Sequence, residues 1–219
     1  MITRQFLELS KTWPATGRHI LASYDAESIV VYQAYRPAIA RYAAEYQQFG
    51  GEFSYSRMSW IKPNFLWMMY RSGWATKPGQ EHILAVRPRR SFFDELLRLA
   101  VPSTYHAHRF PTHEDWQAAV ARSEVRLQWD PDHGPHGNPL ERRAVQLGLR
   151  GSILHRYGTS EVLSIEDITP FVIEQREHLP DDLADLQVPD EAVYLPDDAE
   201  AAKTVGIDRD FRDLSKPEA

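Results

Sequence analysis

The segment from residue 57 to residue 77 interleaves cationic and aromatic side chains. Its cations are Arg57, Lys62, Arg71 and Lys77, and its aromatic residues include Trp60, Trp67 and Trp74. Arginine and lysine neutralise phosphate, and aromatic rings stack on bases, so this pattern is typical of a surface that holds a nucleotide or a nucleic-acid strand. The tryptophans also have a structural interpretation, because a spacing of seven residues places them on about the same face of a helix, if the helix extends that far.

The cationic residues of this segment are harder to explain by packing alone. Burying an unpaired guanidinium or ammonium group among apolar side chains costs free energy. Arg57, Lys62 and Arg71 therefore need either an acidic partner or an anionic ligand. We treat these three residues, together with Trp60, as candidate ligand-binding residues.

Two expected strand ends present further polar side chains. Tyr32 and Gln33 lie near the end of a strand over residues 28–35, just before a helix that begins at Pro37. The backbone donors at that helix start, together with Arg36, would favour an anion. Packing of the tyrosine in the core is the alternative interpretation.

Gln128 and Asp130 end another expected strand, and Pro131 turns the chain immediately afterwards. Residues at strand ends are often presented to a pocket. Asp130 is therefore a candidate catalytic carboxylate, with Glu166 as the second. The alternative for Asp130 is that its side chain only caps the turn.

Two groups of histidines invite a metal interpretation. Asp130, Asp132, His133 and His136 offer oxygen and nitrogen ligands, but their spacing matches no standard zinc pattern, so no metal is expected. His106, His108 and His113 lie in a loop flanked by prolines, which we interpret as an exposed polar loop.

The elements that position these residues follow from hydrophobic period and from turn residues. We expect strands over residues 18–24, 28–35, 81–87, 125–129 and 143–149, and helices over residues 37–50, 63–73, 91–99, 116–123 and 169–178. The first two strands are expected to be joined by a tight turn, and capping boxes are expected at Ser91 and Thr112. The helix after Pro63 is apolar on every side and should be buried centrally. The order lacks regular strand-helix alternation, which predicts a single α+β domain over residues 1–179 with a mixed or antiparallel sheet and several helices.

Charge divides the chain into two parts. Residues 176–219 hold 13 acidic and 5 basic residues, whereas residues 36–90 hold nine basic and three acidic residues. We therefore expect residues 180–219 to form an acidic tail that contains proline. The tail either improves solubility or folds back on the basic body and competes with an anionic ligand.

Composition excludes several classes of protein. The chain has 219 residues, is 42% hydrophobic and contains no cysteine, so it has neither disulfides nor thiolate sites. Its longest apolar run, residues 65–69, is far too short to span a membrane, and residues 1–20 contain no apolar signal core; we expect a cytoplasmic protein without a membrane partner. The fingerprints of dinucleotide-binding folds, phosphate loops, serine esterases and zinc proteases are absent.

Four segments together resemble a bacterial and fungal family known as domain of unknown function 4291. They are IVVYQAY at residues 29–35, RMSWIKPNFLWMMYRSGW at residues 57–74, VRLQWDP at residues 125–131 and RAVQLGLR at residues 143–150. The resemblance covers roughly residues 15–180 and implies a family without an assigned reaction. In the family pattern an arginine commonly stands where this chain has His133.

The function expected from these residues is a group-transfer enzyme that acts on a nucleotide or nucleic acid, with an ADP-ribosyltransferase-like use of NAD as a substrate. Arg57 and Lys62 would hold phosphates, Tyr32 or Trp60 would stack on a ring, and Asp130 or Glu166 would supply the carboxylate. The rivals are a non-catalytic module that binds nucleic acid and a protein-interaction module. The sequence leaves the oligomeric state open.

Overall fold

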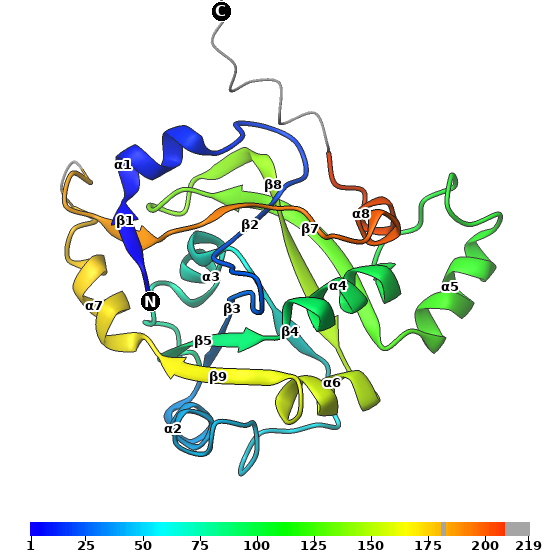
Figure 1. Ribbon diagram of the computed structural model, residues 1–219, viewed down its shortest axis with the longest axis horizontal. Coiled ribbons are helices and arrows are strands. Elements are labelled where there is room, and N and C mark those ends of the chain that lie inside the picture. The colour runs from blue at the N-terminus through cyan, green and yellow to red at the C-terminus, as the bar shows by residue number, and fades with distance from the viewer. Residues whose placement is uncertain (181–182, 209–219) are drawn as a thin grey trace, which may run out of the picture.

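The structure is a computed structural model of the chain and describes residues 1–180 and 183–208. Its helices are α1 (Phe6–Leu9), η1 (Ser10–Thr12), α2 (Pro37–Tyr46), α3 (Phe65–Ser72), α4 (Arg90–Leu99), α5 (His113–Arg122), α6 (Gly151–Gly158), α7 (Thr169–Arg176) and α8 (Ala199–Val205). Its strands are β1 (Thr3–Gln5), β2 (Ile20–Ala22), β3 (Val31–Tyr35), β4 (Ser59–Ile61), β5 (His82–Pro88), β6 (Val101–Pro102), β7 (Val125–His133), β8 (Pro139–Leu149), β9 (Val162–Asp167), β10 (Gln187–Pro189) and β11 (Ala192–Tyr194). These elements form one compact α+β fold, which confirms the expected class (Figure 1).

Two larger sheets organise the domain, and they meet at one seam. The first is antiparallel with strand order β3-β5-β9, and the second has the order β4-β8-β7-β6, in which β6 and β7 are parallel. At the seam the backbone amides of Tyr32 and Lys62 each donate to the other's carbonyl, at 2.6 and 3.3 Å. Lys62, directly after β4, therefore lies where the two sheets join.

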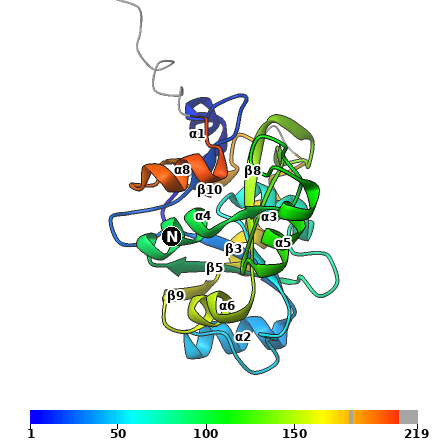
Figure 2. The same cartoon turned by 90° about the vertical axis from the view of Figure 1, so that its right-hand side faces the viewer.

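The sheet β3-β5-β9 is covered on both faces, because alternate residues along a strand point to opposite sides. Val31 packs in one core with Ala40 of α2. Tyr32, its neighbour, packs in a second core with Phe65 of α3 and Val172 of α7. Both views of the ribbon place α2 below β9 and α3 above it (Figures 1 and 2).

The part of the chain after residue 182 is integrated into the domain as far as residue 208. β10 pairs with β1 and β11 pairs with β2, both antiparallel. Tyr194, Ala202 and Val205 are buried in the same core as Val31. The expected boundary at residue 180 is therefore wrong for residues 183–208, because apolar residues spaced among the acidic ones give this segment a buried face. Residues 181–182 and 209–219 of the expected acidic tail lie outside the described residues.

The first two expected strands form, and they pair with each other only next to the turn, where Tyr24 and Ile29 form an antiparallel bridge and the Val30 amide donates to the Ser23 carbonyl at 2.8 Å. Asp25 builds the turn between them, accepting hydrogen bonds from the backbone amides of Glu27 and Ser28 at 2.9 and 2.7 Å. β2 then pairs with β11 rather than with β3. The expected turn is therefore present with its adjoining pairs, and the part of the first strand farther from the turn pairs with a distant segment of the chain.

The starts of three helices show which local sequence signals correctly predicted a helix cap. Thr112 accepts a hydrogen bond from the Asp115 amide at 3.1 Å, as expected, whereas α4 begins after Arg89 without a side-chain cap, so the cap expected at Ser91 is wrong. α6 was not expected from the sequence. Its first turn is capped by the carboxylate of Glu124, which lies 28 residues from Ser152 and leaves no local signal.

Helix α3, which carries several residues of the site described below, is fixed at both ends. Asn64 caps its start by accepting from the Trp67 amide at 2.6 Å, and Gly73 ends it with a φ of 60°. Glu191, from the turn between β10 and β11, accepts from the Phe65 amide at 2.7 Å. As expected from its sequence, the helix is buried from Phe65 to Met69.

Glu191 is expected to make stability decrease with rising pH. It is 1% exposed, and burial raises its pKa well above the ordinary value. The folded chain therefore keeps a proton that the unfolded chain loses above about pH 4.3, so the free energy of unfolding falls as the pH rises from there towards the folded pKa. Glu191→Gln keeps the carbonyl acceptor for Phe65 and should remove this decline in urea unfolding between pH 4 and 9. Exposed Glu8→Gln is the control, and a decline that persists in Glu191→Gln would contradict the prediction.

Candidate functional site

A cavity of about 550 Å³ opens at the seam between the two sheets. Its volume lies in the range of small-molecule sites, which is ~300–1,000 Å³. Polar or charged side chains supply most of the lining: Gln33, Tyr35, Ser59, Lys62, Arg71, Gln80, Gln128 and Gln146, with Ala34, Trp60, Trp67, Met58 and Met68 completing it. We call this cavity the seam pocket.

Asp130 is held beside the seam pocket by two glutamines that line it. Gln128 Nε2 donates to Oδ1 at 2.8 Å, and Gln146 Nε2 donates to Oδ2 at 2.6 Å. Gln128 and Asp130 lie two residues apart on β7, and Gln146 faces Gln128 across the β7–β8 ladder. All three side chains therefore share one face of the sheet, and both carboxylate oxygens have a fixed orientation.

Lys62 is the most deeply buried cation of the seam pocket. It is 5% exposed, and its ammonium nitrogen lies 4.9 Å from the centre of the Trp67 ring. Among the described residues Nζ has no hydrogen bond or ion pair. Burial and the nearby charge of Arg71 lower the pKa of Lys62 to about 7, and Asp130 acts in the opposite direction. Lys62 can therefore exchange a proton near neutral pH.

Arg71 and two tryptophans complete the part of the seam pocket that suits an anion with a ring. Arg71, exposed near the end of α3, contacts the Gln80 side chain at 3.4 Å and makes no ion pair within the described residues. Trp60 lies over Gly148, where an added Cβ would approach its ring to 3.0 Å. The Trp67 side-chain nitrogen is buried without a hydrogen-bond partner in the described chain.

Gln33 supports the wall of the seam pocket. Its carbonyl oxygen accepts from the Tyr157 hydroxyl at 2.8 Å. Its amide nitrogen lies 2.8 Å from both the Tyr35 and Ser59 hydroxyl oxygens, which are also 2.8 Å apart. Because both ends of the Gln33 amide are engaged, this residue fixes the position of Tyr35 and Ser59.

Four of the residues singled out in the sequence lie outside the seam pocket. Tyr32 is fully buried on the opposite face of β3, in the core with Phe65. Arg36 pairs with Glu52 at 2.6 Å. The exposed Arg57 lines a separate hollow together with Arg36. Glu166 is exposed on β9 and lines none of the larger cavities formed by the described residues.

The other six are brought together at the seam: Gln33, Trp60, Lys62, Arg71, Gln128 and Asp130. Trp67, Gln80 and Gln146 belong to the same site but were not singled out as site residues. Gln146 lies in the middle of a strand, and only the pairing of β7 with β8 places it opposite Gln128.

The residues that the sequence offered as metal ligands make separate contacts within the protein. Asp132 pairs with Arg142 at 2.6 Å, and the His133 ring stacks on Tyr70 with centroids 3.5 Å apart. In the part of the chain that the structure describes, no three His, Asp or Glu side chains are grouped in a way that could hold a metal ion.

The fold and the site define a single-domain α+β protein with a cationic, polar pocket at the junction of two sheets. The chain belongs to the family described as Domain of unknown function (DUF4291), whose sequence model matches residues 19–194. That range contains every residue of the seam pocket, and it confirms the resemblance found in the sequence. No curated protein matches the chain. Within the described ranges no helix is both long and apolar enough to cross a membrane.

Proposed function

We propose that this chain is a group-transfer enzyme that binds a nucleotide in the seam pocket, with an ADP-ribosyltransferase-like use of NAD as the first reaction to test. The observation that carries the proposal is the fixed carboxylate of Asp130 next to the buried ammonium group of Lys62. A buried basic group with a perturbed pKa in a cavity that also holds a carboxylate is typical of catalytic sites.

The cations and rings of the seam pocket suit the two ends of a nucleotide. Lys62 and Arg71 would hold its phosphate groups, because neither has an ion-pair partner among the described residues. Trp60 and Trp67 would contact a ring. These contacts give affinity and orientation rather than chemistry.

Asp130 would act at the transferred ribose. In the proposed reaction the bond between the ribose C1′ and the nicotinamide nitrogen breaks, and its electron pair leaves with neutral nicotinamide. The acceptor forms the new bond at C1′ and releases its proton to Asp130. The carboxylate also stabilises the positive charge that develops on the ribose, which requires the fixed position that the two glutamines provide.

The rival, a non-catalytic nucleic-acid module, has less support. It needs a free cationic surface over residues 36–90, but Arg36, Arg87, Arg89 and Arg90 each lie within 4.0 Å of an acidic partner. Their charge is therefore partly neutralised within the domain.

Ligand binding and turnover test the proposal separately. Thermal unfolding with NAD, ATP, GTP, single-stranded RNA and single-stranded DNA identifies the ligand, because a ligand at 100 times its dissociation constant adds about 2.7 kcal/mol of stability. A shift with NAD leads to a nicotinamide-release assay. Shifts with oligonucleotides alone would favour the rival, and no shift at all would favour a protein partner.

Asp130→Asn is expected to lower nicotinamide release by about 10²–10⁴-fold, the usual range for loss of a general base, while NAD still shifts the unfolding temperature. Glu166→Gln separates the two carboxylates singled out in the sequence. Because Glu166 is exposed outside the seam pocket, its variant should keep wild-type turnover. Full turnover in Asp130→Asn would refute the catalytic role of Asp130.

A further inference from the structure

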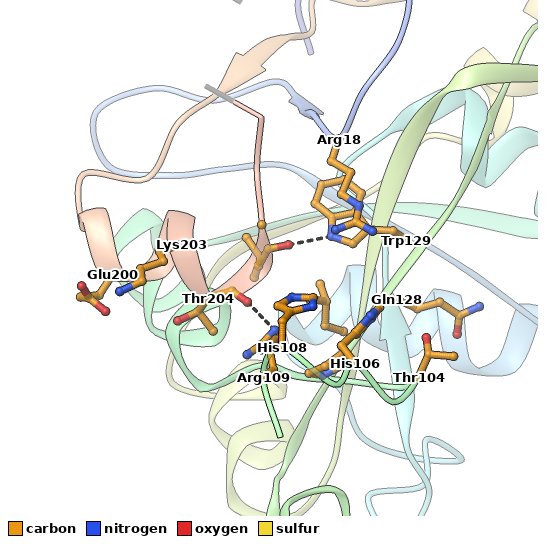
Figure 3. A pocket seen from close by; sticks show the side chains of 14 residues that line it. Arg18, Thr104, His106, His108, Arg109, Gln128, Trp129, Glu200, Lys203 and Thr204 are labelled. Atoms are coloured by element: carbon orange, nitrogen blue, oxygen red, sulfur yellow. Dashed lines mark hydrogen bonds between the residues drawn. The ribbon is translucent and has the colours of Figure 1, made fainter. Parts of the chain in front are cut away.

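A second cavity, of about 430 Å³, lies between α8, β7 and the loop that precedes α5. Figure 3 shows its labelled side chains gathering from separate parts of the chain: Arg18 before β2, His106, His108 and Arg109 from the loop, Gln128 and Trp129 from β7, and Glu200, Lys203 and Thr204 from α8. We call it the α8 pocket. His108 and His113 are exposed, as expected, whereas His106 is half-buried in this pocket, which the sequence did not indicate.

The α8 pocket carries an excess of positive charge. Arg18, Arg109 and Lys203 line it, against the single carboxylate of Glu200. Within the described residues none of these three cations forms an ion pair. Arg109 donates to the Thr204 carbonyl at 2.6 Å, which fixes its guanidinium group without neutralising it.

The electrostatic effects on neighbouring groups agree with this excess. Burial lowers the pKa of His106, and the neighbouring side chains of His108, Arg18 and Arg109 lower it further. A bound anion would offset this repulsion, because it supplies the opposite charge to a group of like charges.

Gln128 connects the α8 pocket to the seam pocket, since it lines both. Its amide also donates to Asp130, the carboxylate assigned to the transfer step. Trp129, the next residue, donates from its indole to the Val205 carbonyl at 2.8 Å and ties β7 to α8 (Figure 3). One short segment of β7 thus borders both pockets.

We propose that the α8 pocket binds the second substrate of the transfer, an acceptor that carries phosphate groups, while the donor occupies the seam pocket. The proposal rests on the proposed function, because a group transfer needs an acceptor as well as a donor, and Gln128 borders both pockets. The volume of the α8 pocket suits one nucleotide unit. That unit is either a free mononucleotide or the end of an oligonucleotide, and the chemistry recognised is the same phosphate group.

The test compares charge removal in the α8 pocket with charge removal elsewhere. Fluorescence anisotropy measures binding of a labelled five-nucleotide single-stranded RNA, and competition measures binding of AMP, both to the full chain between 50 and 200 mM salt. Arg18→Gln with Lys203→Gln should weaken binding about tenfold, and should lower the slope of log affinity against log salt by about 1.4 if both side chains contact phosphates. The control, Arg4→Gln with Arg41→Gln, removes the same charge from the exposed surface of β1 and α2.

A loss for AMP as well as RNA assigns the pocket to a mononucleotide, and a loss for RNA alone assigns it to an oligonucleotide end. Equal binding by the two double variants, or no binding of either probe to the wild-type chain, would overturn the proposal. The Asp130→Asn variant distinguishes failure of the α8-pocket proposal from failure of the proposed function. If Asp130→Asn loses turnover while the α8 variant binds and turns over normally, only the second-substrate site fails; if the α8 variant loses binding but Asp130→Asn keeps full turnover, only the catalytic assignment fails.

Discussion

Replacing Lys62 by methionine is expected to stabilise the protein at pH 6 and to abolish binding of an anionic ligand in the seam pocket. With a folded pKa of about 7, Lys62 loses its proton in the folded chain well before it does so in the unfolded chain, whose lysine pKa is about 10.4. The free energy of unfolding therefore rises with pH between those two values, and below pH 7 the folded state bears the full cost of a buried charge. Replacing Lys62 by methionine removes that charge and should raise the free energy of unfolding by roughly 2–5 kcal/mol at pH 6, and by less at pH 9.

Urea unfolding at pH 6 and pH 9 measures the gain, and the thermal shift with the ligand measures the loss. Lys77→Met is the matched control, since Lys77 is exposed and its ammonium group donates to the Tyr70 and Arg71 carbonyls at the end of α3. That control should lose a little stability and keep ligand binding. A residue that lowers stability but is needed for binding is typical of a functional site. If Lys62→Met gains no stability or still binds the ligand, Lys62 has no such role.

The largest loss of stability is expected from breaking the buried ion pair between Arg142 and Asp132. Arg142 donates to Asp132 Oδ2 from Nε at 2.7 Å, and its Nη2 lies 2.6 Å from the same oxygen, with the two side chains only 7% and 1% exposed. Arg142→Met leaves the Asp132 carboxylate buried without its partner. The free energy of unfolding should fall by about 3–5 kcal/mol in urea unfolding at pH 7.

Two further variants show whether the loss of stability comes from the buried, unpaired carboxylate of Asp132. Arg4→Met removes an exposed pair with Asp190, at 3.6 Å, and should cost about 0–1 kcal/mol. Combining Arg142→Met with Asp132→Asn removes both charges and should recover part of the loss. A double variant that is as unstable as the sum of its singles would show that packing around Arg142, and not the carboxylate, is responsible.

The sequence identified those parts of the fold that local signals determine. The helix of Pro37, the helix after Pro63 and the cap at Thr112 are present, because proline, asparagine and threonine act within one turn. Local patterns did not reveal pairings between distant segments. The partner of β2 lies about 170 residues away, and the cap of α6 comes from Glu124.

The candidate site also combines residues that the sequence indicated correctly with a residue whose position the sequence did not reveal. Residue type and strand ends indicated Lys62, Gln128 and Asp130, which the structure brings together at the seam. Arg57, also chosen for its charge, is exposed outside the seam pocket and lines a separate hollow, although its neighbours Met58 and Ser59 line the seam pocket. Charge and position in the sequence alone did not distinguish Arg57 from Lys62.

The pairing of β1 with β10 and of β2 with β11 has a consequence for the order in which the chain can fold during synthesis. The first two strands leave the ribosome without their partners, which follow only after most of the domain has been made. At ~5–20 residues per second, this interval is roughly 10–30 s. During that time Ile20 and Leu21, both buried in the finished domain, are exposed to other chains and to chaperones. Nascent chains stalled before residue 187 should therefore be protease-sensitive over residues 1–22, and chains extended well past residue 205 should be protected there.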